Sequence, residues 1–219
     1  MDSINEYFFA DMVTPLQLDY LLAHAWRHFG TYFFRYDNSL IPETEEFSAI
    51  IPLRINLELF EFSKSQRKIL KKNEGFKTVF QQASITTTKK KLFELHKQRF
   101  VHNTPENIYS FLSKNPAQYP TSTYEVAVYD KRKLIAVSFI DVAEYSFSSV
   151  YAMFDTAYYP YSLGIYTLLK EIEYAKTLDK KYLYLGYAFK ASSFYDYKKN
   201  FHALEHFDWL ESNWKHFVK

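Results

Sequence analysis

Residues 149–186 read SVYAMFDTAYYPYSLGIYTLLKEIEYAKTLDKKYLYLG, and this stretch decides the fold class. Ser149 to Phe154 has the composition of a β-strand, and Tyr182 to Leu185 reads as a short buried strand that ends at Gly186. Between them, residues 163–178 carry apolar side chains at helical spacing, at Ile165, Leu168, Leu169, Ile172 and Ala175. This spacing predicts an amphipathic helix between two strands.

Working outward, the preceding chain adds further elements. Strands are predicted at Phe47–Phe62, Phe76–Ile85, Tyr124–Tyr129 and Leu134–Asp141, with a hairpin turn at Asp130–Lys133. Helices are predicted at Lys90–Val101 and Glu106–Ser113, and Asn38–Glu46 reads as a loop. The aromatic C-terminal tail is expected to pack back on the body. This order is typical of an α+β domain over residues 48–219, with a small N-terminal unit over residues 1–47 in which Thr14-Pro15 begins a helix.

Composition excludes several classes of protein. The chain has 219 residues, 47% of them hydrophobic, and it has no cysteine. We therefore expect no disulfide, no thiolate nucleophile and no cysteine-bound zinc, iron–sulfur cluster or haem, and a reducing cytoplasm is the simplest location. Only four glycines occur, too far apart for a glycine-rich phosphate loop. The sequence shows neither a secretory signal nor a membrane-spanning run, so no membrane partner is expected.

Histidines offer little evidence for a metal site. His24 and His28 stand four residues apart, a spacing that can bind a metal. No third ligand is evident nearby, so two histidines on an ordinary helix face are the better interpretation, and no metal site is predicted.

Positive charge is concentrated in two short runs. Residues 64–73 carry five cations and no carboxylate, namely Lys64, Arg67, Lys68, Lys71 and Lys72, whereas the whole chain has a net charge of only +2. These positions lie on one face of a short helix that Ser63 is expected to cap. Five like charges on one stripe repel one another unless an anion binds, so this face is predicted to bind a polyanion such as a nucleic acid backbone. A second run, Lys89 to Arg99, would extend the same surface if the fold brought the two together.

Seven segments, taken in order, resemble one known family. They are Trp26-Arg27-x-x-Gly30, Ile51-Pro52-Leu53-Arg54-Ile55, Ser65-Gln66-Arg67-Lys68 with Lys72-Asn73, Ser148–Asp155, Ser162-Leu163-Gly164, Tyr182–Tyr187, and Tyr197-Lys198-x-x-Phe201-x-Ala203-x-Glu205. Together they resemble the arginyl- and leucyl-tRNA–protein transferases, with Ala203 where that family has proline. The resemblance runs from about Trp26 to Glu205, nearly the whole chain.

This resemblance implies a fold, a reaction and its partners. The fold would be similar to that of the GNAT N-acetyltransferases, a mixed sheet flanked by helices. The activity would be transfer of arginine or leucine from an aminoacyl-tRNA to the N-terminal amine of an acceptor protein, without a cofactor. The sequence departs from the family in lacking cysteines before the P-x-R strand. Either it is a transferase without the cysteine-dependent functions, or a relative whose activity has changed.

Candidate site residues follow from that reaction, in which an already activated ester needs alignment and removal of a proton from the attacking amine. Asp155 and Tyr197 are the candidate catalytic groups, and Asp141 is a weaker candidate carboxylate. The candidate substrate-binding residues are Arg54, Tyr158, Ser162, Gly164, Tyr166 and Lys198. The candidate tRNA-binding residues are Lys64, Gln66, Arg67, Lys68, Lys71 and Lys72.

Structural roles compete with several of these assignments. Asp155 could cap a turn, Arg54 could form an ion pair with Glu58 or Glu61, and Tyr197 and Lys198 could be a surface pair. Two other functions also stay open: an N-acyltransferase with another donor, and a non-catalytic module that binds RNA or peptide. If the transferase function is correct, Arg67 and Asp155 must not lie on opposite sides of the molecule with no continuous channel between them.

Overall fold

The computed structural model describes residues 3–42, 44–101 and 104–218. Its strands are β1 (Asn5–Phe9), β2 (Arg27–Phe29), β3 (Tyr32–Tyr36), β4 (Asn38–Leu40), β5 (Phe47–Asn56), β6 (Lys77–Gln82), β7 (Thr123–Asp130), β8 (Lys133–Val142), β9 (Ser146–Phe154), β10 (Tyr182–Phe189), β11 (Leu204–Asp208) and β12 (Asn213–His216). Its α-helices are α1 (Pro15–Ala23), α2 (Lys64–Lys72), α3 (Thr87–Lys97) and α4 (Leu163–Thr177). Short 3-10 helices are η1 (Ile108–Ser110), η2 (Thr156–Tyr161) and η3 (Phe194–Asn200).

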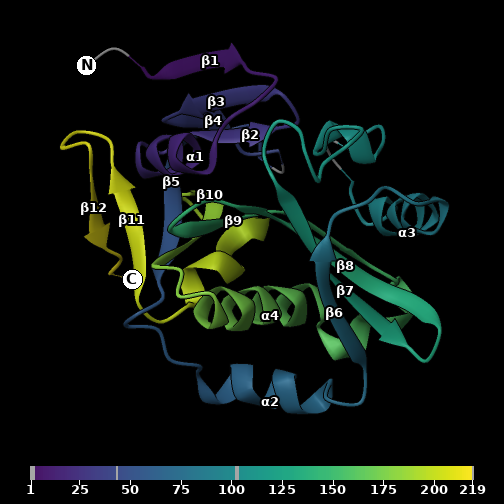
Figure 1. Cartoon of the computed structure of the whole chain (residues 1–219). Helices are drawn as coiled ribbons and strands as arrows, with labels where there is room; N and C mark the ends of the chain where they lie inside the picture. The colour runs from purple at the N-terminus through teal and green to yellow at the C-terminus, as the bar shows by residue number, and fades with distance from the viewer. Residues whose placement is uncertain (1–2, 43, 102–103, 219) are drawn as a thin grey trace.

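A mixed sheet forms the body of the protein (Figure 1). Within the described residues it has nine strands, in the order β12-β11-β5-β10-β9-β8-β7-β6, with β4 paired to β5 beside this path. The neighbouring pairs are antiparallel except β9 and β10, which run parallel and are connected through α4. The strand–helix–strand pattern of residues 149–186 therefore forms a crossover at the centre of the sheet, and the α+β class is confirmed.

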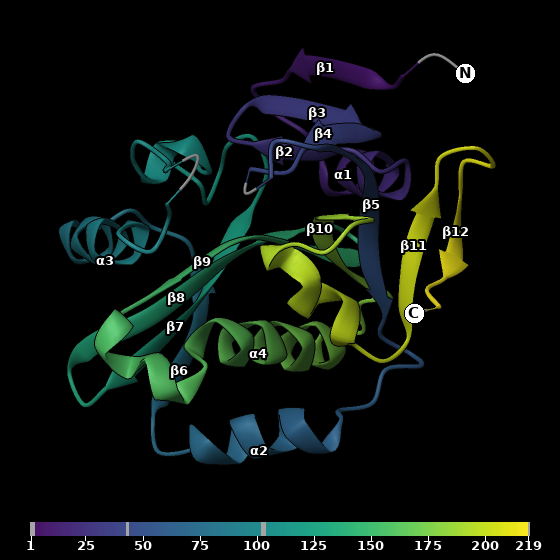
Figure 2. The same ribbon diagram turned by 180° about the vertical axis from the view of Figure 1, so that it is seen from behind.

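Helices cover both faces of this sheet. The apolar stripe predicted on α4 is buried against one face, where Leu169, Ile172 and Leu183 are fully enclosed. Helix α2 packs on the outer side of α4, while α3 contacts β8 and β9 from the opposite face (Figures 1 and 2). The layers are therefore α2, α4, the sheet, and then α3 with the N-terminal unit.

The N-terminal unit is a small sheet with one helix. Strands β1, β3 and β2 pair in that order, and α1 starts at a capping box formed by Thr14 and Gln17. Its core, which includes Leu18 and Phe33, packs against Tyr184 of β10. The predicted helix start is confirmed, but the three strands were not anticipated.

Three element predictions need correction. Strand β5 ends at Asn56, not at Phe62, and residues 52–55 are buried on both faces: Leu53 and Ile55 face α4, and Arg54 is covered by aromatic rings on the opposite face. The predicted helix Glu106–Ser113 is only the 3-10 turn η1, which Asn107 caps by accepting from the Tyr109 amide. The predicted loop Asn38–Glu46 begins with β4, which finds its partner in β5.

The C-terminal tail forms the β11–β12 hairpin and returns to the body, as expected. None of the helices that the structure describes combines the length and apolarity required to cross a bilayer.

Candidate functional site

The two parallel strands at the centre of the sheet separate partway along their length. Strands β9 and β10 pair only from Ser146–Ser148 to Tyr182–Tyr184, although both continue for several residues. A bulge at Gly186, which has a φ of +80°, keeps β10 on β5 and turns it away from β9. We call the diverging halves, residues 149–154 and 185–189, the fork.

Arg27 of β2 reaches into the fork. Its Nη1 donates to Ser148 Oγ and its Nη2 to the Ser149 carbonyl, both at 2.6 Å. The guanidinium also lies close to Gly186, where any Cβ would come within 3.2 Å of Nη2. Burial lowers the pKa of Arg27, but an arginine remains charged in proteins, so the fork contains a fixed buried cation.

Glu171 of α4 supplies a carboxylate to the same region. It is fully buried, and neither oxygen makes a hydrogen bond of normal geometry within the described residues. Burial raises its pKa to about 7, although the nearby hydroxyls of Ser138 and Ser149 and the charge of Arg27 act in the opposite direction. A carboxylate with this pKa can exchange a proton near neutral pH, which suits a general base.

Lys198 of η3 completes the group. Its Nζ donates to the Tyr187 carbonyl at 2.9 Å, and it forms no ion pair with any carboxylate that the structure describes. Burial, and secondarily Arg27, lowers the pKa of this amine to about 7. Lys198 is thus an amine without a counter-ion, and an anionic ligand would stabilise its charged form.

Tyr197 precedes Lys198 in η3. Its side chain is 38% exposed. Desolvation by the surrounding protein, and secondarily Tyr195 and Glu171, nevertheless raises its pKa to about 12. The hydroxyl therefore stays protonated at neutral pH and is available as a donor.

A buried histidine–aspartate pair lies next to Arg27 in the chain, because His28 follows Arg27 in β2. His28 Nε2 lies 2.9 Å from Asp141 Oδ2, and Thr123 donates to the other Asp141 oxygen at 2.7 Å. His28 Nδ1 lies 2.9 Å from the Gly30 carbonyl. This arrangement corrects the expectation of two histidines on one helix face, because α1 ends before His24 and His28 lies in β2. No group of three or more metal-ligating side chains occurs in the part of the chain that the structure describes.

Asp155 lies at the far end of β9. It caps η2 by accepting from the Ala157 amide at 2.9 Å, and it forms an ion pair with Lys133 at 2.7 Å. The six steps along the chain from Ser149 to Asp155 span about 20 Å in an extended strand. The structure therefore does not bring together the two candidate catalytic groups, Asp155 and Tyr197, and the role of Asp155 stays a prediction.

Three more candidate residues surround the start of α4. Tyr158 donates its hydroxyl to Asp130 at 2.8 Å. Ser162 begins α4 in the left-handed conformation, with a φ of +53° and no side-chain cap. Gly164 packs against Phe154, whose ring a Cβ would meet at 3.4 Å. These residues form a compact turn beside Asp155, at the end of β9 that lies away from Arg27.

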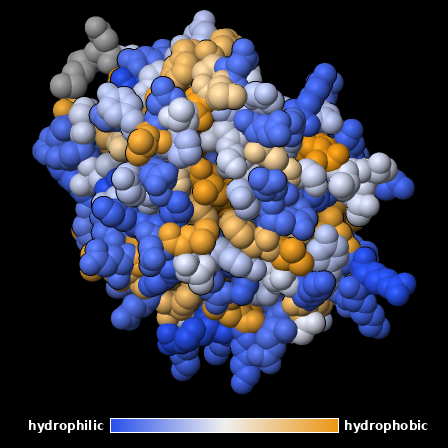
Figure 3. Space-filling view, viewed as in Figure 1, coloured by the Kyte–Doolittle hydropathy of each residue, from blue (hydrophilic) through white to orange (hydrophobic). Residues whose placement is uncertain are grey.

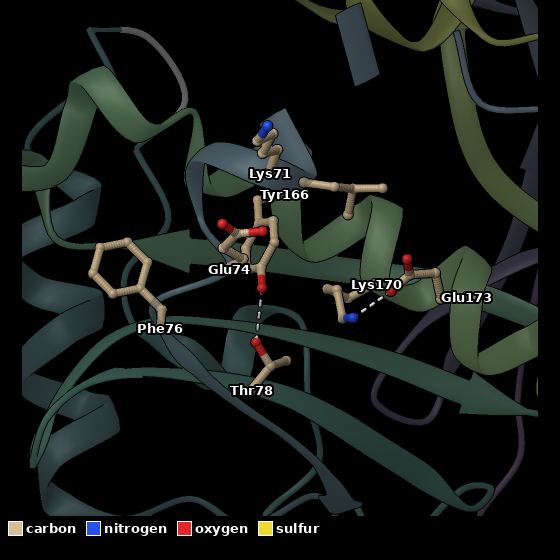
Figure 4. A pocket seen from close by; sticks show the side chains of 8 residues that line it. Lys71, Glu74, Phe76, Thr78, Tyr166, Lys170 and Glu173 are labelled. Atoms are coloured by element: carbon tan, nitrogen blue, oxygen red, sulfur yellow. Dashed lines mark hydrogen bonds and ion pairs between the residues drawn. The ribbon is translucent and has the colours of Figure 1, made fainter. Parts of the chain in front are cut away.

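A hollow of about 560 Å³ lies between α2, α4 and β6 (Figure 4). The figure shows Lys71 and Glu74 on one side and the Lys170–Glu173 ion pair on the other. Tyr166, a candidate substrate-binding residue, shares a 3.0 Å hydrogen bond with Thr78 here and is not in the fork. The hollow opens beside α2 and is lined by both positively and negatively charged side chains.

Helix α2 presents the predicted cationic face. Lys64, Arg67, Lys68, Lys71 and Lys72 are all exposed, and none forms an ion pair with a carboxylate of the described residues. Hydrophilic side chains project at the lower edge of the molecule in Figure 3, where Figure 1 places α2. Gln66 was predicted to bind tRNA with these cations. Its side chain is instead buried and closes a capping box with Ser63, so it is not on this face.

The cationic helix adjoins the turn that Asp155 caps. Lys72 Nζ donates to the Pro160 carbonyl at 2.7 Å, and Asn73 Nδ2 donates to the Tyr161 carbonyl at 3.0 Å. Both carbonyls belong to η2, which Asp155 caps. The cationic helix and Asp155 therefore do not lie on opposite sides of the molecule.

Two other sequence expectations are corrected. Arg54 is not free to bind a substrate carboxylate, because it is paired with Glu205 at 2.6 Å and stacked between Tyr182 and Trp214. Its ion-pair partner is therefore neither Glu58 nor Glu61. The second cationic run does not extend the α2 surface, because α3 lies across the sheet from α2. Its first member, Lys89, is buried in an ion pair with Glu125.

Sequence reasoning missed Arg27 and Glu171 as site residues. A signal existed for Glu171, because it falls on the apolar stripe of its helix, three residues after Leu168 and four before Ala175. A carboxylate at such a position must be buried, and a buried carboxylate requires a partner or a function. Arg27 gave no comparable signal beyond its place in a family segment.

Comparisons with known proteins agree with this architecture. Residues 75–208 match the family described as "Arginine-tRNA-protein transferase, C terminus". The aspartate/glutamate leucyltransferase of Campylobacter jejuni is 28% identical over 187 residues, which cover 83% of this chain and 75% of that protein. The enzyme of the same name from Helicobacter hepaticus is 28% identical over 211 residues, which cover 93% and 84% of the two chains. Among solved structures, FemX is similar with a TM-score of 0.50 at 11% identity, covering 90% of this chain and 68% of FemX, a likeness of fold alone.

Proposed function

This chain belongs to the arginine-tRNA–protein transferase family, and we propose that it transfers leucine from leucyl-tRNA to polypeptides that begin with aspartate or glutamate. The match over residues 75–208 supports the reaction class. The names of the two relatives support leucine as the donor and an acidic N-terminal residue as the acceptor.

The charges of the fork carry this proposal. A polypeptide that begins with an acidic residue brings one carboxylate and one ammonium close together. The fork offers two cations without a carboxylate partner at hydrogen-bond distance, Arg27 and Lys198, and one carboxylate with no hydrogen-bond partner among the described residues, Glu171. The side-chain carboxylate of the acceptor would pair with Lys198, and its ammonium would face Glu171.

The reaction removes two protons from the acceptor nitrogen. Glu171 takes the first from the ammonium, and the free amine attacks the ester carbonyl of the donor. A C–N bond forms, the ester C–O bond breaks, and the second proton of the nitrogen passes to the ribose oxygen, which leaves as a hydroxyl. Tyr197 is protonated at neutral pH and is suited to donate a hydrogen bond to that oxygen. No cofactor is required.

The donor tRNA is proposed to approach from the opposite end of β9. The five cations of α2 would hold its phosphates, and the neighbouring turn, with Asp155, Tyr158, Ser162 and Gly164, would guide the 3′ end toward the fork. Asp155 then belongs to the donor path and does not act on the reacting atoms.

Two finer assignments are part of the proposal. The fold would be related to that of the N-acetyltransferases, which is supported by the parallel β9–β10 pair and the α4 crossover. Residues 1–47 would form an N-terminal unit that is part of the enzyme and not an accessory domain, because it supplies Arg27 to residues 48–219.

A transfer assay tests the function directly. Purified protein is mixed with leucyl-, arginyl- or phenylalanyl-tRNA carrying a labelled amino acid and with peptides that begin with Asp, Glu, Lys or Arg. We expect labelled leucine on the Asp and Glu peptides only. Absence of transfer with every pair would contradict the proposal.

Lys198→Met provides the matching variant. It should lower kcat/KM for the Asp peptide at least tenfold, because the acceptor carboxylate loses its cation. The control is Lys199→Met, which removes the neighbouring lysine that pairs with Asp196. If the two variants were equally active, Lys198 would not be the residue that binds the acceptor carboxylate.

A further inference from the structure

An exposed aromatic surface lies on the N-terminal sheet beside the fork. The β1–β3 register places Tyr7 opposite Phe34 and Phe9 opposite Tyr32, so these rings share one face of the sheet with Tyr36. Tyr7 is 64% exposed, Phe9 68% and Tyr32 39%. We call these five residues the aromatic face.

The rings form a continuous series that ends in the fork. Phe9 and Tyr32 are 5.3 Å apart between ring centroids, Tyr32 and Phe34 5.5 Å, and Phe34 and Tyr36 5.7 Å. Tyr36 meets Tyr187 of the fork at 5.1 Å. Arg27 pairs opposite Phe34 in the β2–β3 register and so projects from the same face.

Three large exposed rings in mutual contact are unusual on a protein without a partner. Two ligands could cover them: unpaired bases, which stack on aromatic rings, or apolar side chains of a polypeptide. An RNA strand needs a cation near each phosphate, and the strand register places none on this face outward of Arg27. The cationic helix that suits RNA is at the other end of the molecule (Figure 1).

Charge complementarity therefore favours a polypeptide. The inner end of the series, at Arg27 and Lys198, suits an acidic group, and the outer end, at Tyr7 and Phe9, suits apolar groups. Through Phe34, the path from Tyr187 to Tyr32 is about 12 Å, or roughly three to four residues of extended chain.

We propose that the aromatic face binds the residues that follow the N-terminal residue of the acceptor polypeptide and favours apolar side chains there. This inference rests on the proposed function, because it takes the fork as the place where the acceptor N-terminus reacts. It adds a determinant of acceptor specificity beyond the first residue.

The test compares two peptides that begin with Asp, one with Leu or Phe at positions 3 and 5 and one with Ser there. With saturating leucyl-tRNA, wild-type protein should show a kcat/KM about tenfold higher for the apolar peptide. In the Tyr7→Ser, Phe9→Ser, Tyr32→Ser variant this ratio should fall to about one. The control is Leu210→Ser, which removes a 72% exposed side chain from the β11–β12 hairpin and should keep the wild-type ratio.

Binding of the same peptides, followed by fluorescence anisotropy without tRNA, makes the test independent of transfer. If neither peptide is leucylated but the apolar one binds more tightly and only to wild type, the aromatic face is correct and the proposed function is wrong. If the triple variant keeps the ratio in both assays, the aromatic face is wrong. If the triple variant raises KM for leucyl-tRNA but keeps the wild-type ratio of kcat/KM between the two peptides, the aromatic face binds RNA and not the acceptor.

Discussion

Arg27 and Gly186 approach each other so closely that a side chain at position 186 would press against the guanidinium. A Cβ there would lie 3.2 Å from Nη2 and 3.3 Å from Cζ of Arg27. This contact joins the N-terminal sheet to the fork and orients the guanidinium toward Ser148 and Ser149.

Gly186→Ala should therefore disturb the fork. The methyl group displaces Arg27, and the φ of +80° is strained for any residue with a Cβ. We expect a loss of about 1–3 kcal/mol in the free energy of unfolding and at least a tenfold loss of transfer activity. Thermal denaturation and the transfer assay measure these effects. Gly75→Ala is the control, because nothing lies within 4 Å of its Cβ position, and equal behaviour of the two variants would contradict the contact.

Glu171→Gln should change how stability depends on pH. Burial raises the pKa of Glu171 from 4.5 to about 7, so between these values the folded protein binds more protons than the unfolded chain. Wild type should lose about 3 kcal/mol of unfolding free energy as pH rises through this window, and the glutamine variant should lack that loss. Urea denaturation at pH 5, 6, 7 and 8 measures it. The control Glu173→Gln, on the same helix, should keep the wild-type dependence of unfolding free energy on pH. If Glu171→Gln also kept that dependence, Glu171 would not titrate in this window.

Arg67→Glu with Lys71→Glu should abolish tight tRNA binding. The change reverses two charges on the exposed face of α2, so we expect at least a hundredfold loss of affinity at low salt and a shallower salt dependence. Filter binding across a salt series measures both quantities. Lys114→Glu with Lys190→Glu makes the same charge change at exposed positions outside α2. If both double variants lose the same affinity, the cationic helix is not the tRNA site.

Asp155→Asn separates a structural role from a catalytic one. Asparagine keeps an acceptor for the Ala157 amide but loses the ion pair with the exposed Lys133, which contributes less than about 1 kcal/mol. Because Asp155 lies at the other end of β9 from Arg27, we expect KM for leucyl-tRNA to rise a few-fold with little change in kcat. A fall in kcat of more than tenfold, with the melting temperature preserved, would return Asp155 to the catalytic group. Asp155→Ala, which also removes the cap, should cost about 1 kcal/mol more.

Local patterns identified most elements, because each depends on residues close in the chain. The capping boxes at Thr14 and Ser63 and the apolar stripe of α4 are complete within a few turns of helix. The cationic face of α2 belongs to this class, since helical spacing alone places its five cations together. Strand β4 and the sheet of β1, β2 and β3 were missed because short strands acquire their structure from partners distant in the chain.

The site residues divide in the same way. Lys198 and Tyr197 were identified through a family segment, but no pattern in that segment indicates a buried amine without a counter-ion. Arg54 was misassigned because strand alternation shows only which face a side chain occupies. The partner of that side chain, Glu205, comes from another strand of the sheet.

The amino-acid sequence by itself determined the α+β class and the cationic face of α2, since composition and periodicity are properties of short stretches, and its ordered segments indicated the family. Only the tertiary structure decided that Arg27, Glu171 and Lys198 meet where β9 and β10 diverge, and that Asp155 does not join them. Burial and the pairing of charges depend on segments that are distant in the chain, so the pKa values that suit this site for proton transfer appear only when the whole sheet is assembled.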